Sequence, residues 1–202
     1  MSSHTAHGCN NTCLHSALDF VMRFVVLKNA PLSEVLREAA EPHVERGKIV
    51  NSAIIGDLDP ADQPKIYRHP EIIHGLRNMI QNAVDFANSA IWVDYSWDDE
   101  NITIRISDDG RGYPEHMLNR IGDPFVRSKK QGSDRNQRPG YKGMGLGLFI
   151  AKTLLERTGA SLKFANGSNA DTVRQKSTER SGAIVQITWE RSQIEHSAII
   201  AW

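Results

Sequence analysis

Three sets of residues on this chain have types and spacings that suit the binding of a phosphorylated ligand. The first set is Asn78, Asn82 and Asp85, whose spacing places all three side chains on one face of a helix. A neutral amide offers a carbonyl oxygen to magnesium and an NH₂ group to phosphate oxygens. A merely solvated helix face is the alternative, but such a face prefers Lys, Glu and Arg, because asparagine is a poor helix former.

The second set places a carboxylate, Asp108, at the end of a predicted buried strand, ahead of Gly110 and Gly112. A carboxylate in that place can accept a hydrogen bond from the exocyclic amine of adenine, and it would reject the carbonyl of guanine. The glycines permit positive φ and a close approach by a ligand. An ordinary Asp-Gly turn is the alternative interpretation.

The third set is a glycine-rich run that leads directly into an apolar helical segment. It reads Gly143-Met144-Gly145-Leu146-Gly147. Backbone N–H groups at a helix start, with glycines ahead of them, form an anion-binding cradle. The run is neither a Rossmann fingerprint, because Leu148 stands where the third glycine belongs, nor a P-loop. A glycine-rich hinge without a ligand is the alternative.

Apolar periodicity predicts the elements that must position these sets. A long helix spans about residues 70–88, and its apolar residues recur as on a core-facing helix. Ile102, Ile104 and Ile106 alternate with polar residues, which predicts a strand with one buried face. Ser33 is expected to cap an earlier helix, and Pro42 ends it.

The other expected elements complete an α+β pattern. They are strands at 47–55, 91–97, 161–165 and 183–189, a hairpin turn at 98–101, and helices at 17–27 and at 147–158, the latter ended by Gly159. The order lacks a regular βαβ alternation. It therefore predicts an α+β fold, with an antiparallel or mixed sheet covered on one face by helices.

Composition limits the class of protein. The chain has 202 residues, 40% of them hydrophobic and 24% charged, and its formal net charge is zero. These values indicate a soluble globular protein and favour neither nucleic acid nor an anionic membrane as a partner. The apolar run at 17–27 is interrupted by Asp19 and Arg23 and is too short to span a membrane. We find no secretory signal at the amino terminus.

The opening segment holds both cysteines of the chain, Cys9 and Cys13, so a disulfide framework is not expected. With His4, His7 and His15 they could act as metal ligands, but the spacing matches no zinc pattern. A tail rich in Ser, Thr, Asn and Gly is the simpler interpretation.

In this order, the motifs resemble the catalytic ATP-binding domain of sensor histidine kinases, whose Bergerat-type fold also occurs in gyrase, Hsp90 and MutL. The resemblance implies an α/β sandwich with a mixed, mostly antiparallel sheet that helices cover on one face. An Asn-bearing helix is followed by Asp108-x-Gly110-x-Gly112, then by Asp123-Pro-Phe125, then by the glycine-rich run. Asp123-Pro-Phe125 resembles the F box of that family, and residues 121–128 match its surroundings. Segments 30–33, 37–43 and 74–86 are similar to the RegB/PrrB redox sensor kinases.

The resemblance implies ATP and Mg²⁺ as cofactors and assigns a role to each motif. Asn82 would coordinate magnesium, Asn78 would contact phosphate or the water shell of the metal, and Asp108 would bind the adenine amine. Residues 127–141 would form the ATP lid, with Phe125 at its hinge. The implied nucleotide-binding residues are Asn78, Asn82, Asp85, Asp108, Gly110, Gly112, Ile121, Phe125, Lys142, Gly143, Met144, Gly145, Leu146 and Gly147.

Two residues depart from the patterns of this fold. Hydrolysing relatives carry a water-activating Glu where this chain has Asn78, and an amide cannot accept that proton. Many histidine kinases carry Lys or Arg where this chain has Asp85. The first departure favours a phosphoryl donor over a hydrolase, and the second makes a nucleotide contact by Asp85 less certain than the others.

The phosphoacceptor histidine of such kinases is not recognisable here. Neither His15, His43, His69 nor His74 has the expected acidic residue after it, with a proline shortly beyond. The resemblance therefore implies the donor half of a two-component kinase, which would act on a separate dimerisation domain and, downstream, on a response regulator. A hydrolysing ATPase and a nucleotide-binding module without kinase activity are the alternatives.

The expected organisation has three parts. Residues 1–30 form a tail that could include a remnant of a dimerisation helix, 31–190 form the catalytic ATP-binding domain, and 191–202 form a second tail. The N-terminal helices could make a homodimer. The expected location is the cytoplasmic portion of a membrane-bound sensor kinase, with no membrane contact by this fragment.

Overall fold

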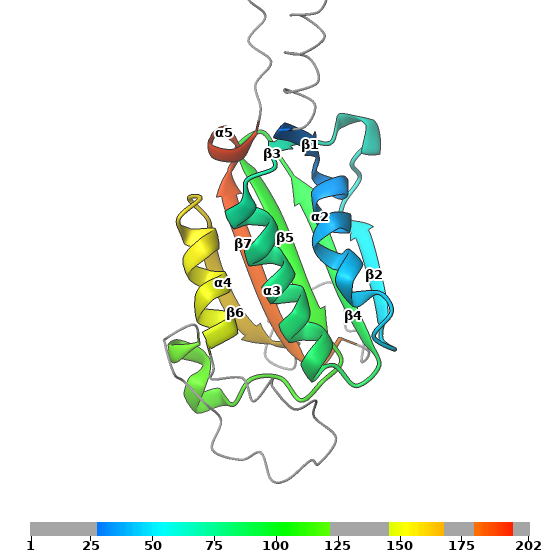
Figure 1. Ribbon diagram of the computed structural model, residues 1–202, viewed down its shortest axis with the longest axis vertical. Helices are drawn as coiled ribbons and strands as arrows, with labels where there is room; N and C mark the ends of the chain where they lie inside the picture. Colours follow the sequence, from blue (N-terminus) through cyan, green and yellow to red (C-terminus); the bar gives the residue numbers. More distant parts are fainter. Residues whose placement is uncertain (1–27, 122–145, 168–179, 196–202) are drawn as a thin grey trace, which may run out of the picture.

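A computed structural model describes residues 28–121, 146–167 and 180–195 of the chain (Figure 1). The expected helix at 17–27 and the lid segment at 127–141 lie outside these residues. The helices are α2 (Leu32–Ala40), α3 (Pro70–Phe86), α4 (Leu146–Glu156) and α5 (Arg191–Ile194). The strands are β1 (Asn29–Pro31), β2 (Ile49–Ile54), β3 (Lys65–Tyr67), β4 (Ala90–Trp97), β5 (Asn101–Asp108), β6 (Ser161–Asn166) and β7 (Ala183–Glu190). Short 3-10 helices occur at Glu41–His43, Pro60–Asp62 and Glu115–Arg120.

Five strands form the main sheet in the order β2-β4-β5-β7-β6. Strand β2 runs parallel to β4, and every other neighbouring pair in this sheet is antiparallel. The predicted 98–101 turn joins β4 to β5 as a hairpin, with Trp97 opposite Ile102. The α+β class and the mixed, mostly antiparallel sheet are therefore confirmed.

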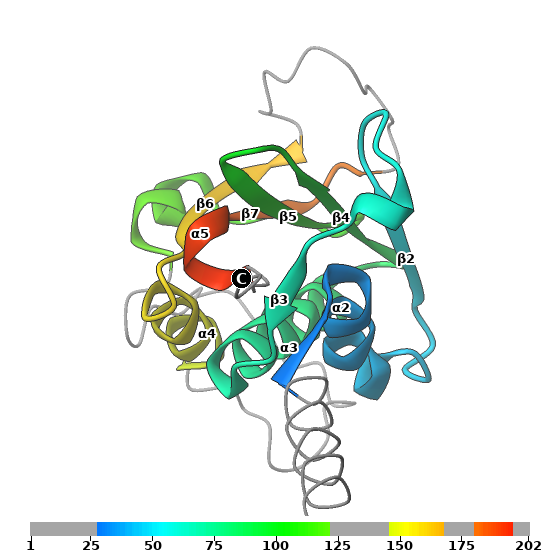
Figure 2. The ribbon, with the colours of Figure 1, turned by 90° about the horizontal axis from the view of Figure 1, so that it is seen from above.

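Helices α2, α3 and α4 lie side by side on one face of this sheet (Figures 1 and 2). The core lies between the two layers. Ile102, Ile104 and Ile106 of β5 are at most 1% exposed, as their alternation predicts, and Leu76 and Ile80 of α3 are fully buried. The apolar face of α3 is thus fixed against the sheet, which leaves Asn78, Asn82 and Asp85 on its opposite side.

A glycine sets the distance between α3 and α4. A Cβ added at Gly75 would lie 2.6 Å from Cγ of the fully buried Leu155 on α4. The absence of a side chain therefore lets the two helices pack closely, and this packing determines where α4 begins relative to α3.

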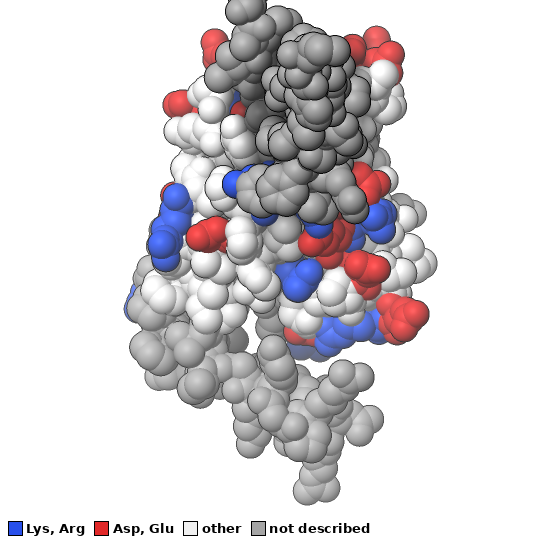
Figure 3. Space-filling model, turned by 45° about the horizontal axis from the view of Figure 1, so that its top comes forward, with Lys and Arg blue, Asp and Glu red and all other residues white. Residues whose placement is uncertain are grey.

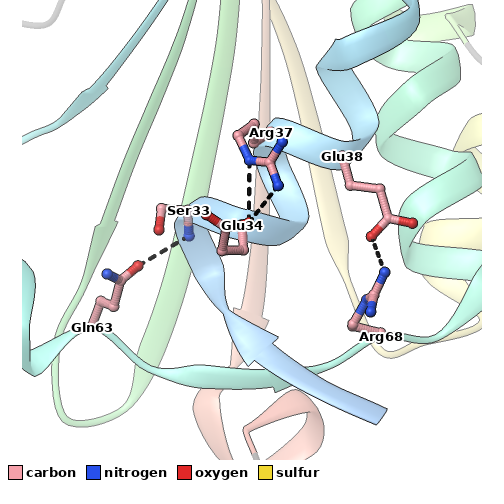
Figure 4. Close-up of polar contacts among 6 residues, drawn as sticks. All are labelled: Ser33, Glu34, Arg37, Glu38, Gln63 and Arg68. Atoms are coloured by element: carbon pink, nitrogen blue, oxygen red, sulfur yellow. Dashed lines mark hydrogen bonds and ion pairs between the residues drawn. The ribbon is translucent and has the colours of Figure 1, made fainter. Parts of the chain in front are cut away.

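The start of α2 differs from the expectation. Pro31 is the N-cap, without a side-chain cap hydrogen bond, so the helix begins two residues earlier than a Ser33 cap would place it. The backbone N–H of Ser33 donates to Gln63 Oε1 at 3.1 Å. A side chain from a distant loop thus satisfies one of the free N–H groups of the first turn (Figure 4).

A small second sheet, β1 with β3, joins the two ends of the described chain. Strand β3 pairs with β1 on one side, and Ile66 forms an antiparallel bridge with Glu195 on the other. Arg68, just after β3, makes an ion pair of 2.6 Å with Glu38 of α2 (Figure 4). Ile194 of α5 is 1% exposed and belongs to the core. The expected domain boundaries at residues 30 and 190 stay a prediction. Helix α5, which follows residue 190, packs on the core through Ile194.

Charged side chains of both signs are interspersed on the face seen in Figure 3. This agrees with the zero net charge and shows no single-sign patch among the described residues of that face. No helix in the described ranges is long and apolar enough to cross a membrane.

Candidate nucleotide-binding site

Asp108 is the last residue of β5 and lies on the helix-covered side of the sheet, opposite Ile91. It is 2% exposed. Its Oδ1 accepts hydrogen bonds from the backbone N–H groups of Gly110, at 2.8 Å, and Ala183, at 3.1 Å. No donor within the described part of the chain reaches the second oxygen. The carboxylate is thus held by one oxygen and can accept a ligand hydrogen bond at the other.

Burial raises the pKa of Asp108 above its ordinary value, while the N–H groups of Gly110 and Ala183 act in the opposite direction. The charged form of this carboxyl group is therefore costly, because it has lost most of its hydration. A ligand that donates a hydrogen bond to the carboxylate would offset part of this cost.

The two glycines after Asp108 are explained by packing. A Cβ at Gly110 would lie 2.2 Å from the carbonyl oxygen of Phe86, so only glycine allows the loop to approach the end of α3. Gly112 has a φ of 71°, which favours glycine, and a Cβ there would lie 2.6 Å from Oδ1 of Asn166. Contact of either glycine with a nucleotide stays a prediction.

Asn166, at the end of β6, holds this loop in place. Its Oδ1 accepts from the backbone N–H of Tyr113 at 2.6 Å, and its Nδ2 donates to the Tyr113 carbonyl at 2.7 Å. The sequence did not reveal this role, because an Asn at a strand end carries no signal of a bond to a loop 53 residues away.

Asp109 joins the same loop to the chain that follows α3. Its Oδ1 accepts from the backbone N–H of Asn88 at 2.7 Å, and its Oδ2 accepts from that of Ser89 at 2.9 Å. This second aspartate thus fixes the end of α3 against the end of β5. Sequence reasoning gave Asp109 no role.

The amides of α3 are available to a ligand. Asn78 and Asn82 are half-buried, and neither side chain forms a hydrogen bond with any described residue. In the described ranges, no group of three or more His, Cys, Asp or Glu could hold a metal ion by itself. A single amide oxygen from Asn82 instead fits magnesium held mainly by phosphates and water.

Asp85 is already engaged. Its Oδ1 lies 2.8 Å from Arg46 Nη2 in an ion pair, and its Oδ2 accepts from Gln81 Nε2 at 2.7 Å. Arg46 lies outside the three motifs and was not considered from the sequence. The predicted nucleotide contact of Asp85 therefore competes with two donors of the protein itself.

The glycine-rich run is described only where it enters α4. Leu146 and Gly147 are the first two residues of this helix, and a Cβ at Gly147 would meet no atom of a described residue within 4 Å. Ile121, 7% exposed, directly follows the 3-10 helix Glu115–Arg120. Predicted site residues outside the described chain are Phe125, Lys142, Gly143, Met144 and Gly145.

The elements that carry the described site residues meet at one end of the molecule. Figure 1 shows the end of α3, the end of β5 and the start of α4 at the lower end, and β1, β3 and α5 at the upper end. The structure thus brings the amides of α3, the Asp108 carboxylate and the first turn of α4 to the same end of the two-layer fold.

Comparison with known proteins places the chain in a family. The chain belongs to the histidine kinase-, DNA gyrase B- and HSP90-like ATPases, and the model of that family matches residues 68–193. The sensor histidine kinase RegB of Cereibacter sphaeroides is 56% identical over 168 residues, which are 81% of this chain and 36% of that protein. CpxA of Escherichia coli, also a sensor histidine kinase, is 31% identical over 62% of this chain and 25% of its own length.

The chain thus spans about a third of the RegB relative. Solved structures share the fold at low identity. The mycobacterial sensor histidine kinase MprB has a TM-score of 0.59 at 18% identity, covering 81% of this chain and 96% of that one. ShkA, solved full-length in complex with AMPPNP, has a TM-score of 0.58 at 21% identity, covering 84% of this chain and 32% of that one. The Bergerat-type fold is therefore confirmed.

Proposed function

We propose that this domain binds ATP with magnesium and donates the γ-phosphoryl group to a histidine on a dimerisation domain of a two-component sensor kinase. The observation that carries the proposal is the buried Asp108 carboxylate, which is held by one oxygen and unbonded at the other within the described chain. The 56% identity to the sensor histidine kinase RegB supports this assignment.

Adenine recognition is the role proposed for Asp108. The ionised carboxylate only accepts hydrogen bonds, so it matches the exocyclic amine of adenine and opposes the carbonyl of guanine. The loop contacts of Asn166 and the backbone N–H groups on Oδ1 hold the acceptor in one orientation. A rigid acceptor strengthens this discrimination, because the site cannot rearrange to satisfy guanine.

Phosphate positioning is the role proposed for α3 and the start of α4. Asn82 would hold magnesium through its amide oxygen, and the ion would neutralise phosphate charge in the bound nucleotide. The NH₂ group of Asn78 would donate to a phosphate or to water on the metal. A Cβ at Gly147 would meet no described atom within 4 Å, and the backbone N–H groups of the first turn of α4 suit an anion. The complex of ShkA with AMPPNP is compatible with such a site.

Phosphoryl donation is favoured over hydrolysis because Asn78 cannot act as a general base. The alternative function, an ATPase of the same fold, would require another group to activate water. Steady phosphate release that is independent of any acceptor would support that alternative.

The acceptor histidine would come from another domain, and a response regulator would receive the phosphoryl group next. In the described chain His43 is 4% exposed within a 3-10 helix, so its imidazole is not accessible for transfer. We further propose that the domain is the cytoplasmic part of a membrane-bound sensor kinase, as the resemblance of its motifs implies.

Phosphotransfer in trans tests the proposal. The chain is mixed with γ-labelled ATP and magnesium, alone and with a dimerisation domain that carries an intact acceptor histidine. We expect almost no label on the chain alone and acid-labile label on the added domain. Rapid stoichiometric labelling of the chain alone, or none on the acceptor in spite of ATP binding, would contradict it.

A further inference from the structure

We infer that Arg46, a residue outside the three motifs, supplies positive charge to the ATP phosphates beside α3, and that Asp85 positions Arg46 and does not itself bind the nucleotide. The inference rests on the proposed function, since it places phosphates on the Asn78 and Asn82 face of the helix. It adds a specificity-determining side chain to that site.

The first support is the geometry around Asp85. Its carboxylate has a donor on each oxygen, Arg46 Nη2 at 2.8 Å and Gln81 Nε2 at 2.7 Å. Gln81 lies one helical turn before Asp85 and fixes the carboxylate from within α3. Arg46 reaches it from the turn that follows α2, 39 residues earlier in the chain. The carboxylate is therefore arranged to hold a guanidinium.

Charge is the second support. Asp85 lies within about 60° of Asn78 and Asn82 around the helix axis. A carboxylate with no counter-charge at this place would repel the phosphates that the two amides are proposed to bind. The Arg46 guanidinium neutralises it.

The free donors of Arg46 are the third support. A guanidinium has five N–H donors, and no other hydrogen bond from this side chain reaches a described residue. The side chain is 33% exposed in the ion pair. Its remaining donors are thus open to phosphate oxygens, which Arg binds with strong charge-assisted hydrogen bonds.

The chain fixes the position of Arg46 by a short turn. His43 is buried, and its carbonyl accepts from the backbone N–H of Arg46 at 3.2 Å. Gly47 follows with a φ of 74°, a conformation that favours glycine and turns the chain toward β2. Burial, and next the charge of Arg46, lower the pKa of His43, so its ring is neutral at pH 7 and adds no charge.

The test compares a ligand that carries phosphates, MgATP, with one that has none, adenosine. Dissociation constants for MgATP and for adenosine are measured by calorimetry on the wild type, Arg46→Met, Asp85→Asn and the exchanged double variant Arg46→Asp/Asp85→Arg. Arg37→Met is the control, since Arg37 forms an exposed ion pair with Glu34 inside α2 (Figure 4).

We expect Arg46→Met to lower the affinity for MgATP roughly tenfold or more, because a charged hydrogen bond is lost. The affinity for adenosine should not change. Asp85→Asn should lower the affinity for MgATP less, because the Arg46 guanidinium remains but is no longer held in place. The double variant should recover much of the affinity, since it keeps one cation and one anion at the site.

Wild-type affinity for MgATP in a folded Arg46→Met variant would overturn the inference and leave the proposed function standing. Loss of adenosine binding in that variant, with no recovery in the double variant, would also overturn it, because the ion pair would then be structural. A wild type that binds neither ligand would overturn the proposed function, and the inference with it.

Discussion

The carboxylate of Asp108 combines a cost in stability with a proposed use in binding. It is 2% exposed, and burial raises its pKa. A carboxyl group with a raised pKa destabilises the fold above that pKa, where it must be charged. The cost disappears below the ordinary pKa of aspartate, where the folded and unfolded chains are both protonated.

Replacement of Asp108 by Asn should therefore stabilise the nucleotide-free domain at pH 7. The amide oxygen can still accept from Gly110 and Ala183, while the buried charge is removed. Thermal unfolding should show a Tm a few degrees above wild type at pH 7, with the difference shrinking as the pH falls through the raised pKa. A variant less stable than wild type at pH 7 would show that the backbone N–H groups more than offset the burial.

Asn82 is the residue on which magnesium dependence should rest. Its amide makes no hydrogen bond in the described chain, so Asn82→Ala removes a ligand with little effect on the fold. Affinity for MgATP should fall by about tenfold, while affinity for ATP in EDTA changes little. An equal loss with and without magnesium would assign Asn82 to phosphate contact.

Sequence reasoning identified side chains by type and spacing, and it succeeded where a local pattern decides position. Asp108 ends β5 because the Ile102, Ile104 and Ile106 alternation stops there. Arg46, Asp109 and Asn166 were not found, because each acts on a residue 20 to 53 positions away. Such contacts come from the packing of elements, and no single segment encodes them.

At the scale of elements, α3 and α4 form the frame of the site, and two glycines show how. Gly75 allows α3 to touch Leu155 of α4, whereas no described residue lies within 4 Å of a Cβ placed at Gly147, at the start of α4. Packing requires the first glycine, and a ligand is the proposed reason for the second.

Alanine at these two glycines should have opposite effects. Gly75→Ala overpacks the helix interface and should cost about 1–3 kcal/mol of unfolding free energy. Gly147→Ala should leave the unfolding free energy unchanged or raise it by up to about 1 kcal/mol, because alanine is the better helix former. The same variant should bind MgATP more weakly. Denaturant unfolding and nucleotide titration on both variants check this. Unchanged MgATP affinity in Gly147→Ala would remove the first turn of α4 from the proposed phosphate site.

The main strands and the long helices were predicted from periodicity, but the small β1-β3 sheet was not. Lys65–Tyr67 is too short to show an alternation, and its strand character comes from pairing with Asn29–Pro31. The same limit explains the misplaced start of α2. Ser33 lies inside the first turn, and its backbone N–H donates to Gln63 from a distant loop.

For the whole molecule, the two ends of the described chain and the site lie at opposite ends of the fold (Figure 1). Strand β3 is flanked by β1 and by Glu195, so the chain enters and leaves beside the same strand. Residues 28 and 195, the first and last that the structure describes, thus lie far from Asp108 and from the start of α4.

A chain reduced to residues 28–195 should therefore retain the fold and the proposed site. It keeps β1, which pairs with β3, and Ile194, which is buried in the core. Thermal unfolding and MgATP titration should give the same Tm and dissociation constant as the full chain. Weaker MgATP binding by the shorter chain at equal stability would assign part of the site to the removed residues.

An adenine-specific pocket built on Asp108 should distinguish ATP from GTP in a binding titration. Affinities for ATP and GTP, with and without magnesium, are measured on the wild type and on Asp108→Asn. We expect the wild type to prefer ATP by at least about tenfold and the variant to lose most of that preference while it stays folded. Equal binding of ATP and GTP by the wild type, or a preference that survives the substitution, would contradict the account.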